Sequence, residues 1–254
     1  MNIFLKFRHF ITLSAQTIVA FAALGGSAAS LVWLEHQNAA LPAPALPRWD
    51  ETAPLIIVDA GHGGHDGGAV ANEIIEKNLA LDLARKVKRE LEAAGLRVRT
   101  TRDSDIFLPL EDRAALAGKH QAAAFVSVHL NTDGAGSDAE GIETYYADSA
   151  PLSARQFASE PVNSADFAAA VQRMVCSTTK AENRGTKARS YAVVVQAPCP
   201  AVLVECGFIT SESEAAKLKR ESYLDQVAQG IAKGVTLFLQ AQPARRGIIA
   251  TAVK

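Results

Sequence analysis

Residues 55–64 read Leu-Ile-Ile-Val-Asp-Ala-Gly-His-Gly-Gly, and this stretch decides the fold. The run from Leu55 to Val58 is continuously apolar, which is typical of a strand buried on both faces of a sheet. The glycines that follow allow the chain to turn sharply where the strand ends. A buried strand leading into a glycine-rich loop favours an α/β protein, in which ligands bind at the carboxyl ends of the strands.

Helical and strand-like segments alternate along the rest of the chain. Apolar residues recur at helical spacing from Leu79 to Leu91, which predicts an amphipathic helix over about 73–94 that Gly95 ends. Further segments are predicted strands at 96–100, 123–130 and 141–147, predicted helices at 110–118, 164–177 and 223–240, and apolar runs at 191–196 and 201–206. This alternation predicts one mixed, mostly parallel sheet of about six strands with helices on both faces.

Composition limits the classes of function. Hydrophobic residues make up 48% and charged residues 21% of the 254 residues, which is enough for a packed core and excludes wholesale disorder. The net charge of -1 gives no electrostatic basis for binding nucleic acid. The three cysteines are Cys176, Cys199 and Cys206, and they form no C-x-x-C pair, which argues against a zinc site with thiolate ligands. The sequence does not decide whether two of them form a disulfide.

The N-terminal segment has the pattern of an export signal, which we expect to be either a signal peptide or a membrane anchor. Lys6 and Arg8 precede an uncharged, largely apolar stretch at residues 10–34. A basic flank before an apolar segment is typical of a cleaved signal peptide, and the stretch is also long enough to serve as an uncleaved membrane anchor. Both alternatives place the basic flank in the cytoplasm and export the rest, so we expect a periplasmic or secreted protein that residues 10–34 could anchor to the inner membrane.

The chain therefore divides into four predicted parts. Residues 1–34 are the signal peptide or anchor, and residues 35–53, which contain three prolines, are an extended linker. Residues 54–241 form one folded catalytic domain, and residues 242–254 form a disordered tail.

Four polar residues interrupt the apolar pattern where a core would not favour them. His62 follows the first strand, and His129 and Glu205 lie at the carboxyl ends of two other predicted strands. Glu76 lies on the apolar face of the first helix, at its start. Taken singly, each has an ordinary explanation, such as a loop histidine, a hydrogen-bonded core histidine or a carboxylate that compensates the helix dipole.

Taken together, these four residues indicate a metal site. Parallel strands bring their carboxyl ends to one edge of a sheet, so His62, His129 and Glu205 converge there beside the helix that Glu76 begins. Two histidines and one glutamate make a three-ligand zinc site with a fourth position open to water. The remaining carboxylate is the general base, and we assign that role to Glu205.

Seven sequence blocks resemble the zinc-dependent N-acetylmuramoyl-L-alanine amidases of the cell-separation type. The blocks are Asp59–Gly64, Glu76–Asn78, Thr101–Asp105, Ser127–Asn131, Gly141–Tyr146, Asn183–Gly185 and Val204–Phe208, in family order. The resemblance covers about Leu55 to Leu239. It implies that His62, Glu76 and His129 bind one Zn²⁺ per chain and that Glu205 is catalytic. It also implies a peptidoglycan substrate, cleaved between the N-acetylmuramic acid lactyl group and L-alanine.

Two departures from the family pattern lie in and after the last block, and the first is Cys206, at a position where family members vary. Thr210-Ser211-Glu212 replaces the usual ending of the last block, which puts substrate contacts there in doubt. Some family members carry a helical insert that plugs the site until a partner removes it. Between Tyr146 and Asn183 there is little room beyond one helix, so we expect an enzyme that needs no activator protein.

Other polar residues near the blocks have open roles. His65 is a further candidate ligand, and His120 is expected to be solvated at a helix end. Glu143 either contributes to the site or faces outward from its strand. Arg102 and Arg113 are expected to form structural ion pairs or to bind substrate carboxylates.

Two other classes of function compete with a zinc amidase. The glycine-rich loop matches neither G-x-G-x-x-G nor a phosphate-binding loop with Gly-Lys-Ser/Thr, which argues against a nucleotide-binding protein. A catalytically inactive peptidoglycan-binding protein of the same fold would lack a ligand or the base, and this chain has all four.

Overall fold

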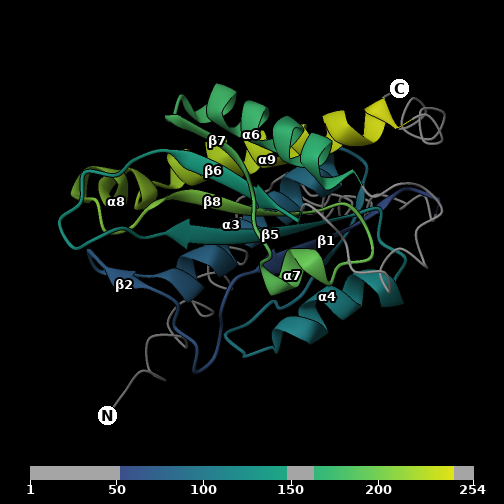
Figure 1. Ribbon diagram of the computed structural model, residues 1–254, viewed down its shortest axis with the longest axis horizontal. Helices are drawn as coiled ribbons and strands as arrows, with labels where there is room; N and C mark the ends of the chain where they lie inside the picture. Colours follow the sequence, from purple (N-terminus) through teal and green to yellow (C-terminus); the bar gives the residue numbers. More distant parts are fainter. Residues whose placement is uncertain (1–51, 148–162, 243–254) are drawn as a thin grey trace, which may run out of the picture. The chain divides into compact units, whose positions relative to one another are not determined.

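The computed structural model describes residues 52–147 and 163–242, which form a layered α/β domain (Figure 1). Its main sheet has six strands in the order β4-β1-β5-β8-β6-β7. These strands are β1 (Leu55–Ala60), β4 (Arg97–Thr100), β5 (Ala124–Asn131), β6 (Ile142–Tyr146), β7 (Asn183–Ala188) and β8 (Ala201–Phe208). Only the β8–β6 pairing is antiparallel, so the predicted mixed, mostly parallel sheet of about six strands is confirmed.

The reversal at β6 determines which ends of the strands meet at each edge of the sheet. Glu143, near the start of β6, pairs with Glu205, near the end of β8. Tyr146, at the end of β6, pairs with Val202 at the start of β8. The first residues of β6 therefore lie beside the carboxyl ends of the parallel strands. Its last residues lie beside the amino ends of those strands.

Helices cover both faces of the sheet, as the sequence predicted. In Figure 1, α6 and α9 lie above the sheet and α4 and α7 lie below it. The helices are α3 (Glu76–Ala93), α4 (Leu110–Lys119), α6 (Ser164–Thr179), α7 (Ala192–Val195), α8 (Glu212–Leu218) and α9 (Glu221–Ala241). The larger core lies between the sheet and α3, α6 and α9, and a smaller core lies under α4 and α7.

Helices α6 and α9 pack closely because glycines line the contact. A Cβ atom on Gly230 would lie 2.5 Å from the Cα of Val175, and one on Gly234 would lie 2.5 Å from the Cα of Val171. Two glycines one turn apart therefore allow the backbone of α9 to rest directly on α6.

Some local predictions from the sequence were incomplete. The apolar run at 191–196 forms the short helix α7, in which Val193 and Val194 are buried, and no strand. Strand β7 has no apolar pattern, because its side chains are exposed or half-buried at the edge of the sheet. The sequence also gave no sign of α8 or of the small hairpin formed by β2 (Val70–Ala71) and β3 (Ile74–Ile75).

The predictions for both ends of the chain lie outside the described residues. These predictions are the signal peptide or anchor at residues 1–34, most of the linker at 35–53 and the tail after residue 242. Within residues 52–147 and 163–242, no helix has the length and apolar character needed to cross a bilayer.

Candidate metal centre and active site

The loop after β1 carries the first candidate ligand. His62 adopts a left-handed backbone conformation with φ 58°, which turns its side chain back over the end of the sheet. Gly61, the residue before it, lies directly against the ring of His129. A Cβ atom on Gly61 would be 2.4 Å from His129 Cε1. The absence of a side chain at Gly61 therefore allows the two histidines to approach each other.

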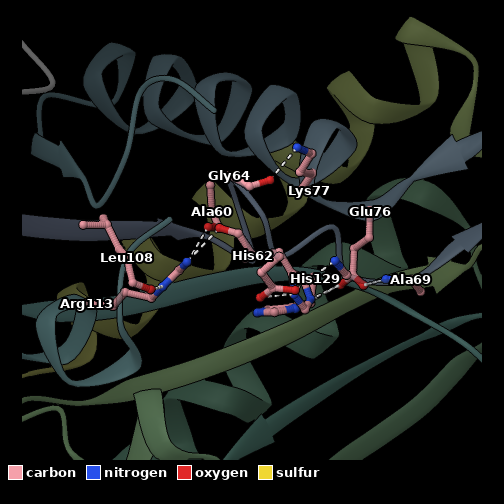
Figure 2. Close-up of polar contacts among 12 residues, drawn as sticks. Ala60, His62, Gly64, Ala69, Glu76, Lys77, Leu108, Arg113 and His129 are labelled. Carbon is pink, nitrogen blue, oxygen red and sulfur yellow. Dashed lines mark hydrogen bonds and ion pairs between the residues drawn. The ribbon is translucent and has the colours of Figure 1, made fainter. Parts of the chain in front are cut away.

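Glu76 joins the two histidines (Figure 2). Its Oε1 lies 3.1 Å from His62 Nε2 and 3.0 Å from His129 Nδ1. Oε1 also accepts a hydrogen bond of 3.1 Å from the Leu130 backbone N–H, and Oε2 accepts one of 2.9 Å from that of Ala69. One ligand atom from each of His62, Glu76 and His129 lies within 4.8 Å of the others. The structure therefore brings together the three residues that the sequence selected as metal ligands.

Hydrogen bonds and charge shift the pKa values of two members of this group, His62 and Glu76. Burial would lower the pKa of His62, but hydrogen bonds and attraction to Glu76 and Asp66 raise it to about 8. Burial would likewise raise the pKa of Glu76, and hydrogen bonds to His129 and His62 hold it well below its usual range instead. Glu76 is therefore an ionised carboxylate with only 5% of its side chain exposed, a state that needs cationic partners.

Asp66 supports the group from outside. Its Oδ2 lies 2.9 Å from His62 Nδ1, and its Oδ1 accepts a hydrogen bond of 3.1 Å from the Gly68 backbone N–H. A carboxylate on one ring nitrogen orients the imidazole and leaves Nε2 to face the centre. The sequence analysis did not assign a role to Asp66, which lies four residues after His62 in the same loop.

Glu205 lies next to this group on the sheet. In the register of the strands it is paired with His129 on β5 and with Glu143 on β6. Its Oε2 is buried and has no hydrogen-bond partner among the described residues. Burial raises the pKa of Glu205 to about 7; the nearby charges of Glu76 and Glu143 raise it as well, and the histidines partly offset this. A carboxyl group of this kind can take up and release a proton near neutral pH.

Two buried arginines donate hydrogen bonds to the backbone at the end of β1 and in the loop after it. Arg113 donates to Asp59 Oδ1 at 3.0 Å, to the Ala60 carbonyl at 2.7 Å and to the His62 carbonyl at 2.7 Å. Arg102 donates to the Ala60 carbonyl at 3.0 Å. Both arginine residues are 2% exposed, so of the two roles expected for them the structure favours the structural one.

The remaining histidines lie outside the group. The ring of His65 packs on Phe107 with 4.2 Å between centroids and contributes no atom to the three-residue cluster. His120 caps the end of α4, where its Nε2 lies 3.3 Å from Arg99 Nη1. By contrast, Glu143, whose role the sequence left open, is 2% exposed and lies on the same face as Glu205.

A comparison with known families decides the classification. The profile of the family described as N-acetylmuramoyl-L-alanine amidase matches residues 56–237, which is most of the chain. The chain belongs to this amidase family. The expected family and the expected fold are therefore both confirmed.

Individual amidases show how far the likeness extends. The amidase domain is 34% identical over 183 residues to the N-acetylmuramoyl-L-alanine amidase LytC of Bacillus subtilis, covering 72% of this chain and 35% of LytC. It is 35% identical to an N-acetylmuramoyl-L-alanine amidase from Clostridium difficile 630 of known structure, with a TM-score of 0.67, covering 75% of this chain and 98% of that one. The chain thus spans about a third of LytC and nearly all of the clostridial chain.

One solved amidase was captured with a partner. The CwlD amidase from Clostridioides difficile, in complex with the GerS lipoprotein, is 27% identical to this chain, with a TM-score of 0.65. The alignment covers 74% of this chain and 100% of CwlD.

Proposed function

We propose that this protein is a zinc-dependent N-acetylmuramoyl-L-alanine amidase. It hydrolyses the amide bond between the lactyl group of N-acetylmuramic acid and L-alanine of the peptidoglycan stem peptide. The observation that carries the proposal is the convergence of His62, Glu76 and His129, with Glu205 paired to His129 on the next strand. Membership of the amidase family supports the same reaction.

The residues present suit zinc. His62, His129 and Glu76 supply two imidazole nitrogens and a carboxylate oxygen, a donor set that zinc enzymes use with a fourth position open. Glu76 is ionised although it is buried, and a divalent cation held by neutral imidazoles would supply the positive charge that balances this carboxylate. We therefore assign these three residues as the ligands of one Zn²⁺.

The chemistry divides between the ion and the protein. When bound, zinc supplies Lewis-acid polarisation of the carbonyl and makes water more acidic. Glu205 Oε2 accepts a proton from the attacking water and delivers it to the amide nitrogen of L-alanine as the bond breaks. Because this oxygen has no competing hydrogen-bond partner among the described residues, it is available for that exchange. Asp66 keeps the ring of His62 oriented throughout.

The decisive experiment combines zinc analysis with digestion of purified peptidoglycan. The full-length protein is expected to hold one zinc per chain and to release stem peptides with a free L-alanine amino group. Glu205→Gln should keep the zinc and abolish release, whereas His129→Ala should lose both. A wild-type protein that binds zinc and peptidoglycan without releasing peptides would show an inactive wall-binding protein instead.

Location and partners follow from the substrate. Peptidoglycan lies outside the cytoplasm, so we propose that the protein is exported by its N-terminal segment, as a periplasmic or secreted enzyme that residues 10–34 could also anchor. We also propose that it acts without an activator. The purified enzyme should then digest peptidoglycan unaided, and dependence on an added partner, such as a lipoprotein, would contradict this.

A further inference from the structure

Two cationic side chains lie over Glu143, beside the proposed catalytic carboxylate. Glu143 Oε2 accepts a hydrogen bond of 3.1 Å from Arg184 Nε and another from Lys187 Nζ. Its Oε1 accepts hydrogen bonds from Asn131 Nδ2, at 2.8 Å, and from the Tyr145 hydroxyl. The side chain of Glu143 is 3% exposed, whereas those of Arg184 and Lys187 are 32% and 38% exposed. Glu143 is therefore a buried carboxylate that binds two partly exposed cationic side chains.

A β-bulge places both cations on the same face. Side chains three residues apart in a regular strand point to opposite faces of the sheet. The β6–β7 pairing shifts in register so that Arg184 and Gly185 together lie opposite Glu143, and Gly185 takes up the shift with φ 79°. The extra residue turns Lys187 onto the face that Arg184 occupies. Bulges commonly redirect side chains in this way next to active sites.

The position of the pair relative to the proposed reaction is fixed by the register. His129, Glu205 and Glu143 lie side by side on β5, β8 and β6. Adjacent strands are about 4.8 Å apart, so β7 lies roughly 10 Å from Glu205 across the sheet. Arg184 and Lys187 thus border the same face as Glu205, on the side away from His62.

The pair has more positive charge than Glu143 can balance. Two cations share one carboxylate at ion-pair distance. Asp133, a second carboxylate that attracts Arg184, forms no direct ion pair with it. Arg184 also donates from Nη1 to the Glu140 carbonyl at 3.3 Å, but its Nη2 has no hydrogen-bond partner among residues 52–147 and 163–242. The guanidinium carbon lies 4.7 Å from the centre of the Phe208 ring, which restricts its movement. An ordered guanidinium beside an ammonium group suits a carboxylate ligand.

We propose that Arg184 and Lys187 form a subsite that binds a free carboxylate of the stem peptide, an inference that rests on the proposed amidase function. The stem residue after L-alanine is joined to the next through its side chain, which leaves its α-carboxylate free. That carboxylate lies about two residues of extended chain, or ~7 Å, from the scissile amide. The long side chains of Arg184 and Lys187 span the remaining distance from β7. The subsite would orient the peptide and would discriminate against stems in which this carboxyl group is amidated.

The test uses two muramyl tripeptides that differ only at this group, one with a free carboxylate and one with a primary amide. The zinc-loaded full-length protein is expected to prefer the free acid about tenfold in kcat/KM, mainly through KM, because the subsite binds ground and transition states alike. Lys187→Gln should reduce the preference to near one, and Lys187→Arg should restore it. Lys233→Gln, an exposed change on α9, is the matched control and should keep the tenfold preference.

The outcomes separate the two proposals. A wild-type protein that cleaves neither tripeptide nor peptidoglycan overturns the amidase function and the subsite with it. Equal cleavage of both tripeptides by the wild type overturns the subsite alone. The subsite is also overturned if Lys187→Gln lowers cleavage of both tripeptides equally while the preference survives. If Lys187→Gln does not fold, as judged by circular dichroism, Arg184→Gln provides the same comparison.

Discussion

Replacing Glu205 with glutamine is expected to stabilise the metal-free protein at pH 8. Burial raises the pKa of this carboxyl group from its ordinary 4.5 to about 7. Each tenfold change in acid dissociation corresponds to about 1.4 kcal/mol, so the ionised group costs the folded state roughly 3 kcal/mol at pH 8. Between pH 4.5 and 7 the folded state keeps a proton that the unfolded chain has lost, so wild-type stability falls as the pH rises through this window. Glutamine does not ionise, so the Glu205→Gln variant does not lose stability in this way as the pH rises.

The assay is urea unfolding of EDTA-treated wild type and Glu205→Gln at pH 5 and pH 8. The neutral amide is itself desolvated, so we expect a gain of about 1–3 kcal/mol at pH 8 that largely disappears at pH 5. An exposed change, Glu182→Gln, serves as the control and should show no such dependence. Equal stability of wild type and Glu205→Gln at both pH values would refute the reasoning, because the carboxylate would then carry no cost of burial.

Two further changes test the geometry around the centre, and a third tests the packing of α9 on α6 away from it. Gly61→Ala places a methyl group on the ring of His129 and should lower kcat/KM about 100-fold, measured on peptidoglycan, while circular dichroism stays unchanged. Asp66→Asn weakens the support of His62 and should reduce zinc affinity about 10- to 100-fold in a competition titration with a chelator; unchanged affinity would show that Asp66 is dispensable. Gly234→Ala forces α9 away from α6 and should lower stability by about 1–3 kcal/mol in urea without changing the zinc content, so a loss of zinc would contradict the separation of this contact from the site.

The central strands and the placement of the candidate site residues were largely predictable, because burial leaves a clear signal in the sequence. Strands β1, β5 and β8 are buried on both faces and therefore appear as mostly apolar runs. A histidine or glutamate at the end of such a run stands out, and parallel strands bring these ends to one edge of the sheet. This combination singles out His129 and Glu205, whereas Glu76 was selected for its place on the apolar face of a helix and His62 for its place in the loop after β1.

The features around the edge strand β7 were not predictable, because an exposed strand leaves no apolar pattern in the sequence. Strand β7 is half exposed and polar, so it shows no period of two. The bulge that turns Lys187 beside Arg184 depends on the pairing of β7 with β6, which is a contact between segments about 40 residues apart. The direction of Glu143 depends on the reversal of β6, which a short strand of this composition does not reveal. Asp66 was missed because aspartates are common in glycine-rich loops and carry little information singly.

The reversal of β6 also determines where a label can be attached to the domain away from the candidate site. The described chain leaves β6 at Ala147 and resumes at Asn163, and both points lie at the edge opposite the centre, where Ser164 Oγ accepts a hydrogen bond of 3.1 Å from the Ala201 backbone N–H. That edge is about 13 Å of strand away from Glu205. A fluorescent label attached at Ala147 or Asn163 would therefore lie at the ends of the strands far from Glu205 and would leave the proposed site uncovered.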